Sequence, residues 1–349
     1  MNPDEGALII FTGGTTGVPK SALLTHKNIA HASFLEATYI HEKGMPLGLK
    51  PRFKMLNNFP PSHAGGSIEI MGTVIVAGCE IVLQEQWNPY GVLRAIKKFK
   101  LQLIGGVPTM YAIMLSLPDL DNFDTSSLVI SIISGEKVSM DLLTGMRDKI
   151  CPNILNAYGS TESGPEVIFT DIGDPLEELA KGYIGKLLPD QEMKIVDENN
   201  NEVLVGEIGE MLFKGTLTIP GYYEMPEENK TTFTADGWCK SGDLGYITED
   251  SRIYIKGRRK FIIRVGSYTV LPSEVEDVVV KHPKVAMVAA VGIPDKIYNE
   301  VVWVAVVPES GQEVVESELI EMCKKELANF KVPKKVVFKK ELPITRLAK

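Results

Sequence analysis

The sequence is poor in cysteine, and its few cysteines are not clustered. Cys79, Cys151, Cys239 and Cys323 lie far apart in the 349 residues and form no Cys-x-x-Cys pair. This spacing favours neither a disulfide framework nor a zinc cluster. A reducing compartment suits such a chain, and we predict a cytoplasmic protein.

An excess of basic residues is absent as well. The chain has 37 lysines and arginines against 45 aspartates and glutamates, and its formal net charge is −8. Neutralising nucleic-acid phosphates requires clustered positive charge in excess, so we expect no nucleic-acid partner. The five histidines show no metal-ligand spacing.

Long uninterrupted apolar runs are also missing. The most apolar long window, Ser67 to Leu83, contains Glu69 and Glu80, and it predicts a buried helix leading to a strand rather than a membrane span. The first residues contain no basic region followed by an apolar core, so we expect no signal peptide.

What the sequence does contain is an α/β pattern. A hydrophobic fraction of 44% over 349 residues suffices for two packed domains. Short apolar runs predict strands at Ala7–Phe11, Glu80–Leu83, Leu101–Gly105 and Leu128–Ser134, and the first of them is expected to be buried. Helices are predicted near Thr25 and at Pro89–Lys100 and Val138–Lys149. This alternation is typical of a mainly parallel sheet.

The second half of the chain has a different pattern of predicted strands and helices. Met193–Val196 and Glu207–Lys214 predict antiparallel strands joined by a polar hairpin loop. Ser273 and Glu276 predict a capping box that opens a helix at Glu274–Lys281. Strands at Val285–Ile293 and Val301–Val307 and a helix at Ser317–Asn329 complete a small α+β unit. We therefore predict a large domain, residues 1–257, with a mainly parallel sheet and a β-rich subdomain, and a small C-terminal domain, residues 258–349.

A loop rich in glycine and threonine occupies Phe11 to Ser21 and reads Phe-Thr-Gly-Gly-Thr-Thr-Gly-Val-Pro-Lys-Ser. Glycines let backbone N–H groups approach phosphate oxygens, hydroxyls donate hydrogen bonds, and Lys20 adds a mobile positive charge. An ordinary strand-to-helix turn needs one or two glycines, so we favour phosphate binding. A Walker A loop is excluded because Pro19 stands where that loop requires glycine.

Five further segments follow in an order that resembles one enzyme superfamily. They are Pro60-Pro-Ser-His63, Tyr158-Gly-Ser-Thr-Glu162, Gly237-Trp-Cys-Lys-Ser-Gly-Asp243, Gly257-Arg-Arg-Lys260 and Pro343-Ile-Thr-Arg-Leu-Ala-Lys349. With the glycine-rich loop, they resemble the motifs of adenylate-forming enzymes: the acyl-CoA synthetases, firefly luciferase and peptide-synthetase adenylation domains. The chain is most similar to an acyl-CoA ligase.

The resemblance implies a role for each matching residue around ATP. It assigns Thr12, Thr15, Thr16, Gly17 and Lys20 to the phosphates, and Gly135, Glu136, Lys137 and Gly159 to the surroundings of the adenine. Tyr158 would stack on adenine, Thr161 would contact the α-phosphate, and Glu162 with Thr16 would hold Mg²⁺, which prefers oxygen ligands. Asp243 would accept both ribose hydroxyls, and Arg258 would contact the ribose or phosphate side.

Four residues would serve the acid, the thiol and the movement between the two steps. His63 would gate the acyl carboxylate, although a histidine packed beneath a loop is an alternative. Lys349 would bridge the carboxylate and the α-phosphate, and Lys260 occupies the hinge position. Gly266 would line the pantetheine tunnel, and an ordinary hairpin glycine is the alternative there.

The implied reaction is the activation of a fatty or aryl acid by ATP and Mg²⁺, followed by acyl transfer to coenzyme A. Two alternatives stay open: adenylation for the thiol of a carrier protein, and an inactive nucleotide-binding fragment. The acid pocket would be lined by Asn58–Gly72, Gly105–Met114, Ser134–Lys137 and Tyr158–Thr161. No aspartate stands at an obvious position for an ammonium group, which favours a plain carboxylic acid.

Three features depart from the family pattern. Gly13 and Ser21 exchange the commoner serine and glycine of the loop, and Ala348 replaces the glycine before the terminal lysine. Only ten residues precede Phe11, whereas family members carry a long stretch there. We expect part of the large domain to be missing, with an exposed sheet edge or a second copy in a homodimer supplying the gap.

Overall fold

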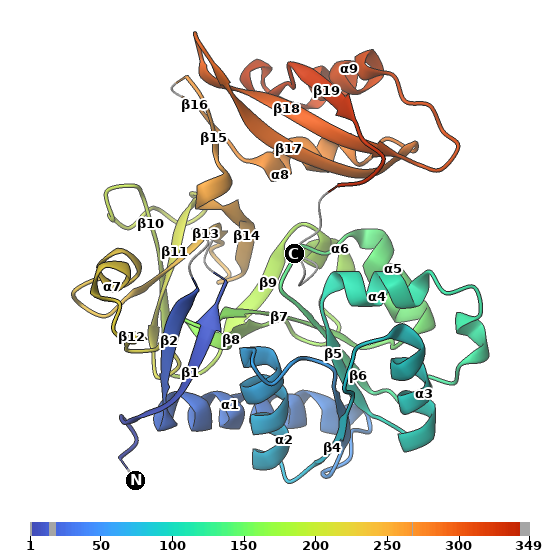
Figure 1. Cartoon of the computed structure of the whole chain (residues 1–349), viewed down its shortest axis with the longest axis vertical. Helices are drawn as coiled ribbons and strands as arrows, with labels where there is room; N and C mark the ends of the chain where they lie inside the picture. The colour runs from blue at the N-terminus through green and yellow to red at the C-terminus, as the bar shows by residue number, and fades with distance from the viewer. Residues whose placement is uncertain (1, 14–18, 267, 343–349) are drawn as a thin grey trace. The chain divides into compact units, whose positions relative to one another are not determined.

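The computed structural model describes residues 2–13, 19–266 and 268–342, and the chain divides into two compact units (Figure 1). The first unit comprises Met1–Ser241 and Tyr246–Ile255, and the second comprises Gly242–Gly245 and Lys256–Lys349. The predicted division at residues 257 and 258, with its hinge at Lys260, stays a prediction.

Five parallel strands form one half of the large sheet in the first unit. They are β3 (Lys54–Asn57), β4 (Glu80–Leu83), β5 (Leu103–Gly106), β6 (Ile130–Ser134) and β7 (Ile154–Ser160), in the spatial order β7-β6-β5-β3-β4. The helices between and around them are α1 (His26–Gly44), α2 (Thr73–Val76), α3 (Pro89–Phe99), α4 (Pro108–Leu115) and α5 (Met140–Lys149). The prediction of a parallel α/β sheet is confirmed for this half.

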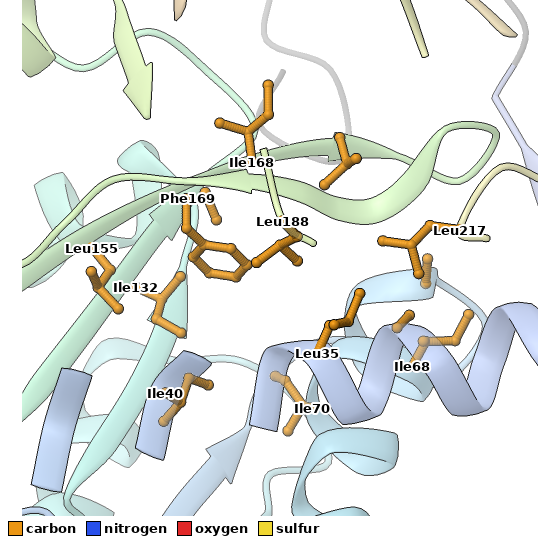
Figure 2. Close-up of a cluster of buried hydrophobic side chains, with 14 of the residues drawn as sticks. Leu35, Ile40, Ile68, Ile70, Ile132, Leu155, Ile168, Phe169, Leu188 and Leu217 are labelled. Atoms are coloured by element: carbon orange, nitrogen blue, oxygen red, sulfur yellow. The ribbon is translucent and has the colours of Figure 1, made fainter. Parts of the chain in front are cut away.

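Alternate residues of these strands enter two different cores, as the two-residue period of a strand requires. In β3, Met55 joins the core beneath α1, whereas Leu56 joins the core beneath α3, α4 and α5. Figure 2 shows the first core, in which Leu35 and Ile40 of α1 lie on one side and Phe169 lies on the other. Both faces of the parallel strands are therefore covered by helices.

The other half of the sheet contains antiparallel strand pairs. Its strands are β8 (Gly164–Phe169), β9 (Tyr183–Leu187), β10 (Gln191–Val196), β11 (Gly209–Gly215), β13 (Cys239–Ile247) and β14 (Ile253–Arg258). Their order is β10-β11-β13-β14-β9-β8, and β8 pairs with β7. Met193 lies opposite Phe213, so the predicted antiparallel hairpin of β10 and β11 is confirmed. Two short helices, α6 (Leu176–Ala180) and α7 (Pro226–Thr232), lie in the connections.

The glycine-rich loop joins two strands of a separate small sheet. This sheet has the order β1-β2-β12 and consists of β1 (Gly6–Thr12), β2 (Lys20–Thr25) and β12 (Gly221–Tyr222). The prediction of a buried first strand is wrong, because only Ile10 of β1 is buried and Phe11 is 69% exposed. The predicted helix near Thr25 is confirmed: α1 begins at His26, and the Thr25 hydroxyl accepts from the Asn28 N–H.

The apolar window from Ser67 to Leu83 has the predicted order of helix and then strand, with one difference. A π-helix, Gly65–Gly72, precedes α2, and β4 follows. Short π-helical segments are rare and occur frequently at functional sites. Among the described residues, no helix is both long enough and apolar enough to cross a membrane.

The second unit is built on an antiparallel hairpin. Its strands are β15 (Ile263–Val265), β16 (Tyr268–Val270), β17 (Val285–Asp295), β18 (Asn299–Pro308) and β19 (Lys335–Phe338), and its helices are α8 (Pro272–Val279) and α9 (Glu316–Glu326). Strands β17 and β18 pair antiparallel, with Ala289 opposite Ala305, which confirms the two predicted strands.

The predicted capping box of Ser273 and Glu276 is wrong. Helix α8 begins earlier, at Pro272, because proline is well suited to the first helical position, where its missing N–H would have no partner. The Glu274 carboxylate accepts from the Leu271 N–H at 3.2 Å. The Ser273 hydroxyl instead donates to the Lys256 carbonyl at 2.6 Å, and Glu276 accepts from the Ala290 N–H.

We expect replacement of Leu93 by alanine to destabilise the first unit by about 2–5 kcal/mol. Leu93 in α3 is fully buried in the core beneath α3, α4 and α5, so truncation leaves a cavity. Leu83, which is 67% exposed, is the control, and Leu83→Ala should stay within about 0.5 kcal/mol of wild type. Denaturant unfolding measures both, and equal losses in the two variants would contradict this assignment of the core.

Candidate functional site

The ends of the glycine-rich loop lie beside a carboxylate that is distant in sequence. Strands β1 and β2 pair with Thr12 opposite Lys20, so the loop closes a hairpin. The Thr12 hydroxyl donates to Glu162 Oε1 at 3.3 Å, across 150 residues of sequence. Thr12, at one end of the loop, and the Tyr158–Glu162 segment are therefore brought together, as a shared site for phosphates and Mg²⁺ requires.

Tyr222 of β12 completes this contact. Its hydroxyl donates to the same Glu162 oxygen at 2.8 Å, and Lys20 Nζ lies 4.9 Å from the centre of its ring. Burial, and then the neighbouring Glu162 carboxylate, raise the pKa of Tyr222, so its hydroxyl stays protonated as a donor. The sequence did not predict Tyr222 as a site residue, because it comes near Glu162 through the pairing of β12 with β2.

The turn from β7 to β8 holds Thr161 and Glu162 in place. A Cβ atom at Gly159 would lie 2.2 Å from the Pro165 carbonyl oxygen, so no side chain fits there. Ser163 donates its N–H to the Ser160 hydroxyl at 3.1 Å, which closes the turn. Thr161 is buried, and Glu162 is half-buried. The glycine of the Tyr-Gly-Ser-Thr-Glu motif is thus a requirement of close backbone packing.

The predicted adenine segment lies beside Tyr158. Ser134, the last residue of β6, is paired with Ala157 of β7, so Gly135, Glu136 and Lys137 leave the sheet next to Tyr158. Gly135 has a φ of +96°, which favours glycine. The Tyr158 ring packs against Phe213 with 5.9 Å between ring centres. Ligands of open α/β sheets bind at such carboxyl ends of strands.

Asp243 and Arg258 are brought together within the second unit. Arg258 Nε lies 2.9 Å from Asp243 Oδ1; the Asp243 side chain is 6% exposed and that of Arg258 is 50% exposed. The pKa of Lys260 is lowered, first by partial loss of solvent at its ammonium group and then by the charge of Arg258. The residues predicted for the ribose thus form an ion pair.

His63 lies directly before the π-helix. Its Nδ1 accepts from the Gly65 N–H at 3.1 Å, which assigns the proton of the neutral imidazole to Nε2. Its carbonyl accepts from the N–H groups of Gly66 and Ser67, each at 3.1 Å. The backbone and ring of His63 are therefore both tied to the first turn of the π-helix.

Gly266 occupies the turn between β15 and β16. Its φ is +61°, its N–H donates to the Tyr298 carbonyl at 2.6 Å, and a Cβ atom there would meet no atom within 4 Å. The hairpin alternative explains the choice of glycine, and its role in a pantetheine tunnel stays a prediction.

Some predicted residues lie outside the described residues. They are Thr15, Thr16 and Gly17 of the glycine-rich loop, together with Lys349 and Ala348. Their predicted roles at the phosphates, at Mg²⁺ and at the acid stay predictions.

Comparison with known proteins gives the family. Residues 1–223 match the family described as AMP-binding enzyme, and residues 274–349 match the AMP-binding enzyme C-terminal domain. The chain belongs to the AMP-binding enzymes. The predicted membership of the adenylate-forming superfamily is confirmed.

Relatives within this family include named ligases. The long-chain-fatty-acid–CoA ligase of Bacillus subtilis (strain 168) is 31% identical over 344 residues, which cover 98% of this chain and 60% of that protein. The mitochondrial medium-chain acyl-CoA ligase ACSF2 of Mus musculus is 30% identical over 340 residues, covering 97% of this chain and 55% of that protein. The chain thus spans about 60% of the length of the first of these relatives.

Solved structures of the family share the fold. ATP-bound MatB from Rhodopseudomonas palustris matches with a TM-score of 0.89 and 28% identity, covering 100% of this chain and 67% of MatB. o-Succinylbenzoate CoA synthetase (MenE) from Bacillus subtilis, in complex with ATP and magnesium ion, matches with a TM-score of 0.85 and 28% identity, covering 100% of this chain and 69% of MenE. The predicted fold class is confirmed.

We expect Gly159→Ala to destabilise the first unit by at least about 1–3 kcal/mol, because the new methyl group would overlap the backbone of β8. Gly105→Ala is the matched control: Gly105 is also a buried strand glycine, but its Cβ would lie 4.0 Å from the nearest atom, Met55 Cε. This control should stay within about 1 kcal/mol of wild type. Chemical denaturation measures both, and a stable Gly159→Ala protein would refute the proposed constraint.

Proposed function

We propose that this chain activates a carboxylic acid with ATP and transfers the acyl group to the thiol of coenzyme A. In the first step, a carboxylate oxygen attacks the α-phosphorus and pyrophosphate leaves. In the second step, the thiol sulfur attacks the acyl carbon, AMP leaves, and the thiol proton passes to solvent. The observation that carries the proposal is the contact of Thr12 with Glu162, which joins a phosphate-type loop to a carboxylate.

The residues around Glu162 fit a magnesium ion bound to ATP. Glu162 supplies a half-buried carboxylate beside threonine and tyrosine hydroxyls, and oxygen is the ligand atom that Mg²⁺ prefers. Glu162 and Thr16 would hold the ion, which would neutralise charge on the phosphates. Thr12 and Lys20 stand at the two ends of the loop that would bind those phosphates, with Thr15, Thr16 and Gly17 between them.

The nucleoside would be held by the residues that the family motifs assign to adenine and ribose. Tyr158 would stack on adenine, flanked by Gly135, Glu136 and Lys137. Asp243 would accept the ribose hydroxyls, and it is already oriented by Arg258. Thr161 would donate to the α-phosphate, where negative charge grows as the carboxylate attacks.

The acid substrate is proposed as a class of compound and not as one compound. The relatives named as long-chain and medium-chain ligases support a fatty acid, and an aryl acid is the other class. His63 would lie at the acid carboxylate and Lys349 between this carboxylate and the α-phosphate. Rotation of residues 258–349 about Lys260 would then exchange Lys349 for the Gly266 face, where the thiol arrives. A cytoplasmic location and a homodimer stay predictions.

The proposal predicts acid-dependent exchange of labelled pyrophosphate into ATP across a panel of fatty and aryl acids. Glu162→Gln should lower the exchange rate at least about tenfold, because the amide does not neutralise the metal ion. Glu85→Gln, at an exposed position, is the control and should leave the rate unchanged. Binding of ATP without any acid-dependent exchange would replace this proposal by a nucleotide-binding role.

Lys349→Ala should abolish pyrophosphate exchange while sparing thiol transfer from a supplied acyl adenylate. The lysine is proposed to act only while two anions approach each other, and the second step starts after they have reacted. Adenylation is measured as pyrophosphate exchange. Thiol transfer is measured separately, once with coenzyme A and once with a phosphopantetheine carrier protein as the acceptor. Equal loss of both half-reactions would refute the role of Lys349. Transfer to the carrier protein alone would show that the acceptor is the carrier protein and not coenzyme A.

A further inference from the structure

Three glutamates from three separate elements meet in the interior of the first unit. Glu36 of α1 and Glu166 of β8 are 4% and 7% exposed, and Glu69 of the π-helix is half-buried. The Glu69 carboxyl lies within hydrogen-bonding reach of the Glu166 carboxyl, and Glu36 interacts with both. This glutamate cluster, Glu36, Glu69 and Glu166, has no part in the ATP chemistry proposed above.

No cation is among the groups that shift the pKa values of Glu36 and Glu166 within the described residues. The charged groups there that shift these pKa values are carboxylates alone. Burial comes first among the causes that raise both pKa values, followed by Glu69, and for Glu166 by Glu36 as well. Like charges in a poorly solvated interior cannot all ionise, so protons remain at neutral pH.

The hydrogen bonds of the cluster are incomplete without protons. The Thr73 hydroxyl donates to Glu36 Oε2 at 2.9 Å, but Glu166 Oε2 is buried and has no hydrogen-bond partner among the described residues. Ionised carboxylates only accept hydrogen bonds, whereas a protonated carboxyl also donates one. A shared proton therefore turns the contact of Glu69 with Glu166 from repulsion into a hydrogen bond.

Neutral donors and one imidazole also contact the π-helix beside the cluster. Asn57 of β3 donates to the Gly66 carbonyl, and Ser33 of α1 approaches the Ile68 carbonyl. A Cβ atom at Gly65 would lie 3.2 Å from Glu69 Oε2 and 3.3 Å from His63 Nδ1, so the imidazole borders the cluster. Because Gly65, Gly66 and Ser67 also bond to His63, the position of the π-helix fixes the position of His63.

We propose that Glu36, Glu69 and Glu166 share protons across the junction of α1, the π-helix and β8, and that these protons hold the π-helix and His63 in place. Loss of the protons at alkaline pH drives the π-helix away from α1 and β8 and displaces His63. The effect on the acid rests on the proposed function, since His63 is there assigned to the acid carboxylate. The effect on the π-helix does not.

The sign of the pH dependence follows from the raised pKa values. Above 4.5, the ordinary value for glutamate, the unfolded chain has lost protons that the folded cluster keeps. Stability therefore falls as pH rises from 4.5 through the folded pKa values, and the unfolding constant grows up to about tenfold per pH unit for each such proton.

The first test compares the 349-residue protein with Glu166→Gln and Glu36→Gln, which cannot lose the proton. Denaturant unfolding between pH 5 and pH 9 should show a steep alkaline loss of stability in wild type and a shallower one in each variant. Glu42→Gln, at an exposed position of α1, is the control and should follow wild type. Two substitutions allow for a variant that fails to fold, and equal pH slopes in all four proteins would overturn the proposal.

The second test reads the π-helix and the acid site separately. At pH 9, hydrogen exchange of residues 65–72 should be faster in wild type than in Glu166→Gln, and the two should agree at pH 5. The KM for the acid in pyrophosphate exchange should rise with pH more in wild type than in the variant. Exchange activity that is absent in every protein would refute the proposed function and leave the unfolding result intact. Equal hydrogen exchange of residues 65–72 in wild type and Glu166→Gln at both pH values would overturn the proposal that the shared protons hold the π-helix in place.

Discussion

The carboxylate of Glu162 accepts hydrogen bonds from Thr12, at one end of the glycine-rich loop, and from Tyr222, on the strand beside it. These two bonds join a hairpin near residue 12, the turn after β7 and a short strand near residue 222 at one point. The small sheet β1-β2-β12 could bind phosphate only weakly by itself, since its loop lacks a negative group to hold a divalent ion. The contact with Glu162 supplies that group, so the proposed chemistry depends on it.

The position of Glu162 depends in turn on backbone packing. The missing side chain at Gly159 lets β7 approach the Pro165 carbonyl, and Gly164, with a φ of +115°, turns the chain back into β8. The same turn sets Thr161 and Tyr158 at the carboxyl end of the parallel strands, next to Gly135. One tight turn therefore positions the residues proposed for adenine, α-phosphate and metal together.

Most of the site residues could be predicted from the sequence, because they lie in motifs of a few consecutive residues. Glycine and hydroxyl residues within ten positions predict the loop, and the alternation of apolar runs predicts β4, β5, β6, α3 and α5 closely, whereas α4 was not predicted. The exposure of β1 was not predictable, because Ile9 and Phe11 are apolar yet 37% and 69% exposed. Nor was the start of α8, where Pro272 outweighs Ser273 and tertiary contacts take the Ser273 hydroxyl. Tyr222 and the glutamate cluster depend on contacts between distant segments, which no spacing along the chain records.

Helix α1 shows how the glutamate cluster differs from an acid that is paired with a cation. Near the C-terminal end of α1, Lys43 pairs with Asp171. Burial raises the pKa of Asp171, but the hydrogen bond and charge of Lys43, together with Tyr39 and Lys186, outweigh it and the net pKa is lowered. Asp171 is therefore charged at neutral pH. Glu36 occupies the same helix, but the charged group that acts on it is the Glu69 carboxylate, and burial and this like charge outweigh the hydrogen bond from Thr73, so its pKa is raised. An apolar side chain at Glu36 would fill the space without a titrating group, but it could neither accept from Thr73 nor respond to pH. The cluster thus gives the segment behind His63 a dependence on protons that packing alone would not provide.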